Sequence, residues 1–138
     1  MRANLTISAF LCLLCLAWPV AARADVAVIV HPGNPLHTMT TREVSDLYLG
    51  RARALSVYEL PADNPLRELF FRSLNGMSIR QLNAYWARLR FSGEVLPPAT
   101  LADSRAVVDT VSRNPNAIGY VNAAALRDSV KVVLRLKE

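Results

Sequence analysis

The sequence predicts an α/β protein with a mixed, mostly parallel β-sheet flanked by helices. Strand and helix signals alternate along the chain, which is the pattern of a sheet covered by helices. The first strand, residues 26–30, is a continuous apolar, β-branched run typical of a strand buried on both faces. The last strand, residues 130–136, alternates Val and Leu with Lys and Arg, which favours an antiparallel edge.

Residues 1–24 are expected to be a cleaved secretory signal peptide. Arg2 gives a positive start, and the apolar run over residues 5–17 is too short to span a bilayer. Ala22 and Ala24 supply the small side chains of a cleavage site. We therefore expect cleavage after Ala24, a periplasmic or secreted location, and no membrane span in the remaining chain.

Residues 25–138 are predicted to form a single domain. Both cysteines, Cys12 and Cys15, lie in the expected signal, so the rest of the chain has no disulfide and no thiolate metal site. The formal net charge is +5 and falls to +3 when Arg2 and Arg23 leave with the signal. Because this charge is mild and no aromatic residues interleave with a basic stripe, nucleic-acid binding is not expected.

The first helix is predicted to follow the proline-rich loop at residues 31–35. Thr40 and Glu43 have the spacing of a capping box, which places the helix start at Thr40, and Gly50 ends the helix. Residues 55–60 have the pattern of a second strand.

The second helix is predicted to begin at Asp63-Asn64-Pro65, because a capping residue is followed by proline in the first turn. Asn75-Gly76 closes it. Its expected buried stripe consists of Leu66, Leu69, Phe70 and Leu74.

The third helix has the clearest amphipathic pattern in the chain. Ser78 and Gln81 form a second capping box, and Gly93 ends the helix. The pattern predicts a core helix with a basic outer face. Its expected buried face consists of Ile79, Leu82, Trp86 and Leu89.

A fourth helix is predicted after an extended connection held by Pro97-Pro98. Either Asp103 or Ser104 is expected to cap it. Its apolar side consists of Val107, Val108 and Val111.

Residues 113–121 combine a helix stop, a turn and a buried strand. Pro115 cannot continue the fourth helix and pushes Asn114 out of helical geometry, while Asn116 suits a turn. Residues 118–121 then have strand character. Gly119 marks either a bulge or a place where another backbone or a ligand comes close.

The common enzyme constellations are missing from the sequence. His31 and His37 share a loop, but no cysteine or carboxylate cluster joins them, so no metal site is expected. The five glycines are isolated from one another, which excludes a glycine-rich phosphate loop. No serine lies in a Gly-x-Ser-x-Gly elbow. We expect no enzyme activity and no cofactor.

Helix starts are the places in this chain that can bind an anion, because free N–H groups and the positive end of the helix dipole meet there. A simply capped terminus without a ligand is the alternative at each of them. Arg67 could add a charged fork to its helix start, pair with Asp63 or point into water. The candidate starts are Thr40-Thr41, Asp63-Asn64 with Arg67, and Ser104-Arg105.

Several blocks of the sequence, taken in order, carry a family resemblance. They are Val28-Ile29-Val30 with Pro32 and Asn34-Pro35, Leu47-Tyr48-Leu49-Gly50-Arg51, Trp86 with Phe91-Ser92-Gly93, and residues 114–121. In this order the blocks resemble phosphate-type periplasmic substrate-binding proteins. The chain is similar to the short, single-lobe members of the group, which implies one lobe of a type 2 periplasmic binding protein.

The resemblance implies that the ligand loop lies at residues 63–68. The family sequence there is Asp-Gly-Ser-Gly-Thr-Thr, and this chain has Asp63-Asn64-Pro65-Leu66-Arg67-Glu68. Only Asp63 matches, since Pro65 has no N–H, Leu66 has no polar group and Glu68 adds negative charge.

The functional expectation is therefore an exported substrate-binding-like protein that binds a small, phosphate-like anion in association with transport. Asp63, Asn64, Arg67, Thr40 and Thr41 are its candidate ligand-binding residues. The alternative is a periplasmic interaction or regulatory module that keeps the scaffold without binding a ligand. Its partner would be a membrane transporter or sensor protein.

Overall fold

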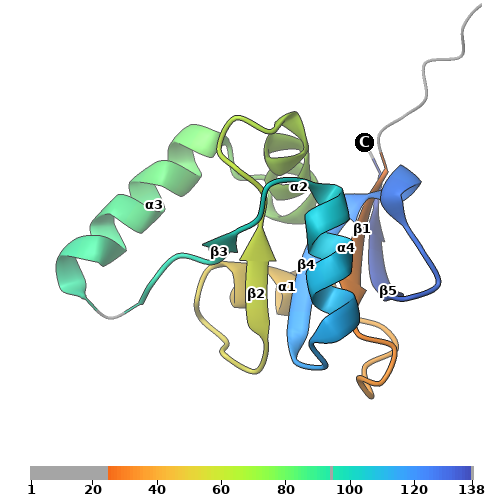
Figure 1. The fold of residues 1–138 in the computed structure, drawn as a ribbon. Helices are drawn as coiled ribbons and strands as arrows, with labels where there is room; N and C mark the ends of the chain where they lie inside the picture. The colour runs from red at the N-terminus through yellow and green to blue at the C-terminus, as the bar shows by residue number, and fades with distance from the viewer. Residues whose placement is uncertain (1–24, 94, 138) are drawn as a thin grey trace, which may run out of the picture.

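The computed structural model describes residues 25–93 and 95–137, and these form a three-layered α/β unit (Figure 1). The expected signal peptide, residues 1–24, lies outside them. No helix in the described ranges is long and apolar enough to cross a membrane. The elements in chain order are β1 (Val26–Val30), α1 (Thr41–Tyr48), β2 (Ser56–Glu59), α2 (Pro65–Asn75), α3 (Ile79–Ser92), β3 (Ala99–Thr100), α4 (Ser104–Arg113), β4 (Ala117–Asn122), the 3-10 turn η1 (Ala123–Ala125) and β5 (Lys131–Leu136).

The strands form one mixed sheet in the order β3-β2-β4-β1-β5. Strand β2 pairs in parallel with β3 and β4, whereas β1 pairs antiparallel with β4 and β5. Among these strands, β1 therefore runs opposite to the other four. The predicted mixed, mostly parallel sheet is confirmed, and so is antiparallel pairing at the β5 edge. The two-residue strand β3 has no counterpart in the sequence prediction.

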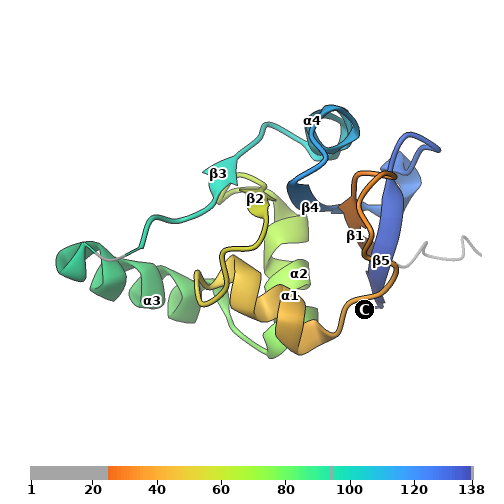
Figure 2. The ribbon, with the colours of Figure 1, turned by 90° about the horizontal axis from the view of Figure 1, so that it is seen from below.

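Helices cover both faces of the sheet (Figure 2). Helix α4 packs on one face against β4 and β1, and α2 packs on the other face against β1, β4 and β5. Helix α1 lies beside α2. Helix α3 extends outward past the edge formed by β3 (Figure 1).

The core lies on both faces of the sheet, under α1 and α2 on one face and under α4 on the other. All five residues of β1 are buried, as their continuous apolar run predicts. A cluster of aromatic rings joins α1, α2 and β4, in which Phe70 and Tyr120 are stacked. The Tyr48 ring meets Phe70 edge-on at 4.9 Å between centroids. Leu69, predicted in the buried stripe of α2, is only half-buried, and Phe71 is fully buried instead.

Helix boundaries agree with the sequence signals. Thr40 and Ser78 form the two predicted capping boxes. Asn64 caps α2, and Asp103, not Ser104, caps α4. Gly50, Gly76 and Gly93 have positive φ angles at the predicted helix ends.

Helix α3 is not the core helix that its pattern predicts. Leu82 and Trp86 are buried, but Ile79 and Leu89 are only half-buried. Phe91, near its C-terminal end, is 94% exposed. The apolar stripe is present, but the helix extends past the sheet edge, and only Leu82 and Trp86 of the stripe are fully buried.

Residues 113–121 connect α4 to β4 as predicted. Helix α4 ends at Arg113, Asn114 has extended geometry, and β4 starts at Ala117. Gly119 marks a close approach rather than a bulge, because a Cβ atom there would clash with the Val107 side chain of α4. The missing side chain therefore lets α4 pack closely on the sheet.

Candidate anion-binding site

The structure places the candidate residues in two separate groups, one after β1 and one after β2. Strand β1 is antiparallel to β4, so the loop that leads from β1 to Thr40 and Thr41 leaves the end opposite to the loops that follow β2 and β4. Asp63, Asn64 and Arg67 follow β2. The two groups therefore do not form one site.

At the α1 start, the side chains are occupied by capping. The Thr40 hydroxyl accepts a hydrogen bond from the Glu43 N–H at 3.2 Å, and the Glu43 carboxylate accepts one from the Thr40 N–H at 2.8 Å. Thr41 is exposed. This arrangement satisfies the helix terminus and brings a carboxylate to it, which is unfavourable for an anion.

The first-turn amides of α2 are also occupied. The Asn64 side chain accepts a hydrogen bond from the Leu66 N–H at 3.0 Å, and the Asn64 carbonyl accepts one from the Arg67 N–H at 3.0 Å. Pro65 has no N–H. Asp63 is exposed. The dipole of α2 remains available to a ligand, but the N–H groups of Leu66 and Arg67 are already hydrogen-bonded.

Arg67 is buried under the α2 start and does not point into water or pair with Asp63. Its Nε donates to the carboxylate of Glu59, which lies at the end of β2 and is also buried. The Arg67 guanidinium also lies 5.8 Å from the centre of the Phe71 ring. Burial raises the pKa of Glu59, while the positive charge of Arg67 opposes that rise. The sequence analysis did not identify Glu59 as a site residue, although a charged residue within an apolar strand pattern could have indicated it.

Two of the predicted helix starts converge on one groove of about 620 Å³ between α2 and α4. We call it the helix-start groove. It lies at the end of the sheet where β4 finishes, and Asn122 contributes to its wall. Its polar residues include Asn64, Glu68, Arg72, Ser104, Arg105 and Asn122.

The free donors of the helix-start groove belong to α4. The Asp103 carboxylate accepts from the Ala106 N–H at 2.8 Å, whereas the N–H groups of Ser104 and Arg105 have no hydrogen-bond partner among the described residues. The Ser104 hydroxyl oxygen accepts from the Asn122 N–H at 3.1 Å. The Arg105 side chain is exposed. These donors and the dipole of α4 all favour a bound anion.

Acidic side chains limit the charge of the helix-start groove. The Glu68 carboxylate pairs with Arg72 at 2.6 Å, so these two charges compensate each other. Arg105 balances the capping carboxylate of Asp103. The groove is therefore close to neutral, and an anion gains mainly from directed N–H donors and helix dipoles.

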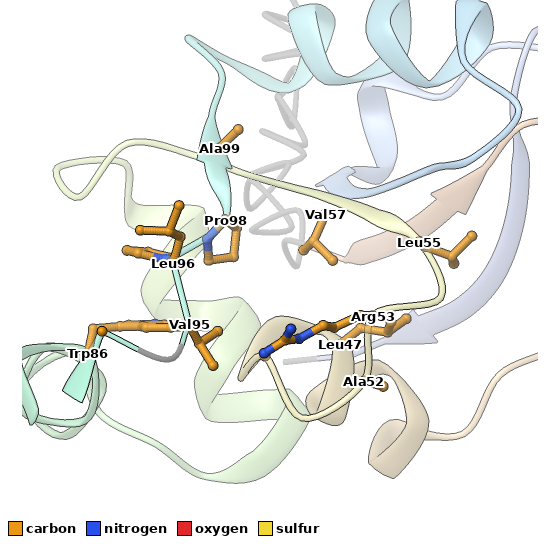
Figure 3. Close-up of a pocket in the computed structure, with 13 residues that line it drawn as sticks. Leu47, Ala52, Arg53, Leu55, Val57, Trp86, Val95, Leu96, Pro98 and Ala99 are labelled. Atoms are coloured by element: carbon orange, nitrogen blue, oxygen red, sulfur yellow. The ribbon is translucent and has the colours of Figure 1, made fainter. Parts of the chain in front are cut away.

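A second hollow, of about 550 Å³, is lined mainly by residues with apolar side chains (Figure 3). Trp86, Val95, Leu96 and Pro98 lie on one side of it, and Leu47, Leu55 and Val57 lie on the other, with Arg53 between them. We call it the apolar hollow. Its walls offer few groups that could orient a charged ligand.

Metal binding has no support in the described part of the chain, where no group of three or more His, Cys, Asp or Glu side chains is placed to hold an ion. His31 accepts a hydrogen bond from the Gly33 N–H at 2.9 Å through Nδ1. This contact orders the loop after β1.

Comparison with solved structures identifies the fold of this chain. No family model matches the sequence, and no curated protein matches it. A structure described as a phosphate ABC transporter substrate-binding protein with bound phosphate, from Clostridium perfringens, matches with a TM-score of 0.64 at 20% identity. An ABC-type phosphate transport receptor from Vibrio cholerae matches with a TM-score of 0.63 at 14% identity. The chain has the fold of one lobe of these binding proteins.

The match covers most of this chain and about half of each solved structure. It spans 80% of this chain and 45% of the Clostridium perfringens protein, and 83% of this chain and 55% of the Vibrio cholerae protein. A possible phosphate-binding protein from Planctomyces limnophilus shows the same relationship, with a TM-score of 0.59, 15% identity and 41% of its length covered. These TM-scores establish a shared fold.

Proposed function

We propose that this chain is an exported, periplasmic substrate-binding-like protein that binds a small anion such as phosphate in the helix-start groove, in association with transport. The observation that carries the proposal is the convergence of two helix starts on one groove, with unpaired N–H groups at Ser104 and Arg105. Binding without a catalytic step is sufficient for this role.

Two further observations support the proposal. The fold matches that of solved phosphate-binding proteins, one of which is described with bound phosphate. Residues 1–24 have the pattern of a signal peptide. A transport role would require a membrane transporter or sensor as partner.

The proposed binding mode uses directed donors more than net charge. The N–H groups of Ser104 and Arg105 would donate to anion oxygens at the positive end of α4. The Arg105 guanidinium could supply a second, bidentate contact. Asn122 adds an amide at the end of β4. Asp63, which the family resemblance favours, and Arg67, a candidate of the α2 start, stay outside this contact set.

Thermal melting of the purified protein against phosphate and sulfate tests the proposal. A Kd of about 10 μM would stabilise the fold by about 2.7 kcal/mol at about 1 mM ligand. Arg105→Ala should weaken binding about tenfold, because it removes a charged donor without disturbing a buried contact. The matched control is Arg80→Ala, at an exposed position on α3. A melting temperature unchanged by every anion tested contradicts the proposal.

The second candidate function is an interaction or regulatory module, and the exposed end of α3 favours it. Phe91 is 94% exposed and Leu96 is 87% exposed, so two large apolar side chains lie in water on a projecting element. Cross-linking in an envelope extract should then capture a partner with the wild-type protein and lose it with Phe91→Ser/Leu96→Ser. Arg88→Ala, on the same helix, is the control that should retain the partner.

A further inference from the structure

A third hollow lies on the other side of the first turn of α2 from the helix-start groove. Its volume is about 340 Å³, and it is enclosed by the end of β2, the start of α2, one side of α3 and the segment leading into β3. We call it the arginine hollow. Its polar walls are formed by Glu59, Arg67, Asn83, Trp86, Arg90 and Thr100.

Two buried donors in the walls of the arginine hollow lack partners. Nη1 of Arg67 and Nε1 of Trp86 are buried and make no hydrogen bond with any described residue. The residues themselves are 8% and 6% exposed, respectively. Buried N–H groups are nearly always paired in native proteins, and an orphan group requires an explanation such as a bound water or ion. Two such groups around one hollow point to an occupant with acceptor atoms.

The charge of the arginine hollow favours an anionic occupant. Glu59 compensates Arg67 through the hydrogen bond at Nε, which leaves Nη1 available. Arg90 reaches the hollow from α3 and forms no ion pair with a described residue. Asn83, two turns before Arg90 on α3, adds a side-chain amide. Positive charge therefore exceeds negative charge by one in this set of side chains.

We propose that the arginine hollow is a second binding site, which takes a small oxyanion such as a carboxylate or phosphate group. Nη1 of Arg67 and Nε1 of Trp86 donate to two of its oxygens, Asn83 donates a further hydrogen bond, and Arg90 covers it from the solvent side. Two donors from different elements, α2 and α3, fix the orientation of the group. The occupant is either a free small anion or an acidic group presented by a partner protein.

This site is independent of the proposed phosphate site. The helix-start groove uses the start of α4, whereas the arginine hollow uses α2 and α3, and no residue lines both. The second site gives α3 a function, because Asn83, Trp86 and Arg90 of this helix line the arginine hollow.

Fluorescence of Trp86 gives a local test. The chain has two tryptophans, Trp18 and Trp86, so a Trp18→Phe chain reports on Trp86 alone. Titration with phosphate, sulfate, succinate and an acidic peptide should give a saturable change in emission with at least one of them. A response to the small anions identifies a free ligand, whereas a response to the peptide alone identifies a partner's acidic group.

Substitutions then locate the ligand. Arg90→Gln, at an exposed position, should weaken binding at least tenfold, while Arg88→Gln should leave it within about twofold. Trp86→Phe keeps a smaller aromatic ring and removes the N–H, and it should reduce the ligand-dependent rise in melting temperature. No emission change with any ligand overturns the proposal. A signal that Arg105→Ala abolishes and Arg90→Gln preserves also overturns it, because the ligand would then lie in the helix-start groove.

Discussion

The rings of Phe70 and Tyr120 stack in parallel, with centroids 3.8 Å apart and an angle of 10° between their planes. Phe70 comes from α2 and Tyr120 from β4, so this contact fixes the helix against the centre of the sheet. The Tyr120 hydroxyl also accepts a hydrogen bond from the Leu60 N–H, immediately after β2, at 3.2 Å. The Tyr120 side chain therefore connects β4 both to α2 and to the segment between β2 and α2. The start of α2 lines the helix-start groove.

Tyr120→Phe should destabilise the fold by about 1–3 kcal/mol, because the buried N–H of Leu60 loses its acceptor while the ring stack remains. Urea unfolding followed by circular dichroism measures this change. Tyr58→Phe is the matched control, since Tyr58 is only half-buried and its hydroxyl has no hydrogen-bond partner among the described residues. Equal losses in the two variants would show that the Leu60 contact contributes nothing.

Gly119→Ala should destabilise the fold by about 1–3 kcal/mol, because the new methyl group overlaps the Val107 side chain. The double variant Gly119→Ala/Val107→Ala removes that overlap. Its loss in unfolding free energy should therefore be smaller than the sum of the two single losses. Strict additivity would mean that the close packing of α4 on β4 is not the reason for glycine at this position.

The local features of the fold could be predicted from the sequence because they depend on adjacent residues. The capping box of Thr40 and the glycine stop at Gly76 each involve only a few neighbours in the chain. The exposure of α3 could not be predicted from the sequence, because the spacing of apolar residues identifies a stripe on the helix but not the element that covers it. Phe91 fits the end of an amphipathic helix equally well whether it is buried or exposed.

The candidate site was harder to predict, because it depends on strand direction and on contacts between elements. The apolar run of β1 indicates burial, but the direction of β1 decides from which end of the sheet the chain leaves toward Thr40. The pairing of Arg67 with Glu59 likewise requires α2 to fold back over the end of β2. The sequence did identify Ser104-Arg105 as a helix start able to bind an anion, and the structure places it beside the start of α2.

Thr40→Ala should lower the unfolding free energy by about 1 kcal/mol through loss of the cap on α1. Phosphate affinity should change less than about twofold, because Thr40 does not line the helix-start groove. Urea unfolding and a phosphate titration measure the two effects. Ser78→Ala, the other capping-box residue, should give the same pair of results. A loss of affinity in Thr40→Ala alone would relocate the anion site to α1.

Glu59→Gln should change how stability depends on pH. Burial raises the pKa of Glu59 above its ordinary value of 4.5, with Arg67 opposing the rise, so the folded state binds this proton more tightly than the unfolded state does. The stabilisation that comes from this proton is fully present below about pH 4.5 and is lost as pH rises through the folded-state pKa. Glutamine does not titrate, so the Glu59→Gln protein does not lose this stabilisation as pH rises.

The unfolding free energy of wild type minus that of Glu59→Gln should thus decrease as pH rises from about 4 to about 8, which urea unfolding at several pH values measures. Taking the difference cancels the titration of the other groups that the two proteins share. Glu68→Gln is the control, because its exposed pair with Arg72 should contribute less than about 1 kcal/mol. A difference that increases with pH would mean that the attraction of Arg67 outweighs burial. Glu59 would then hold Arg67 most firmly as a carboxylate at neutral pH.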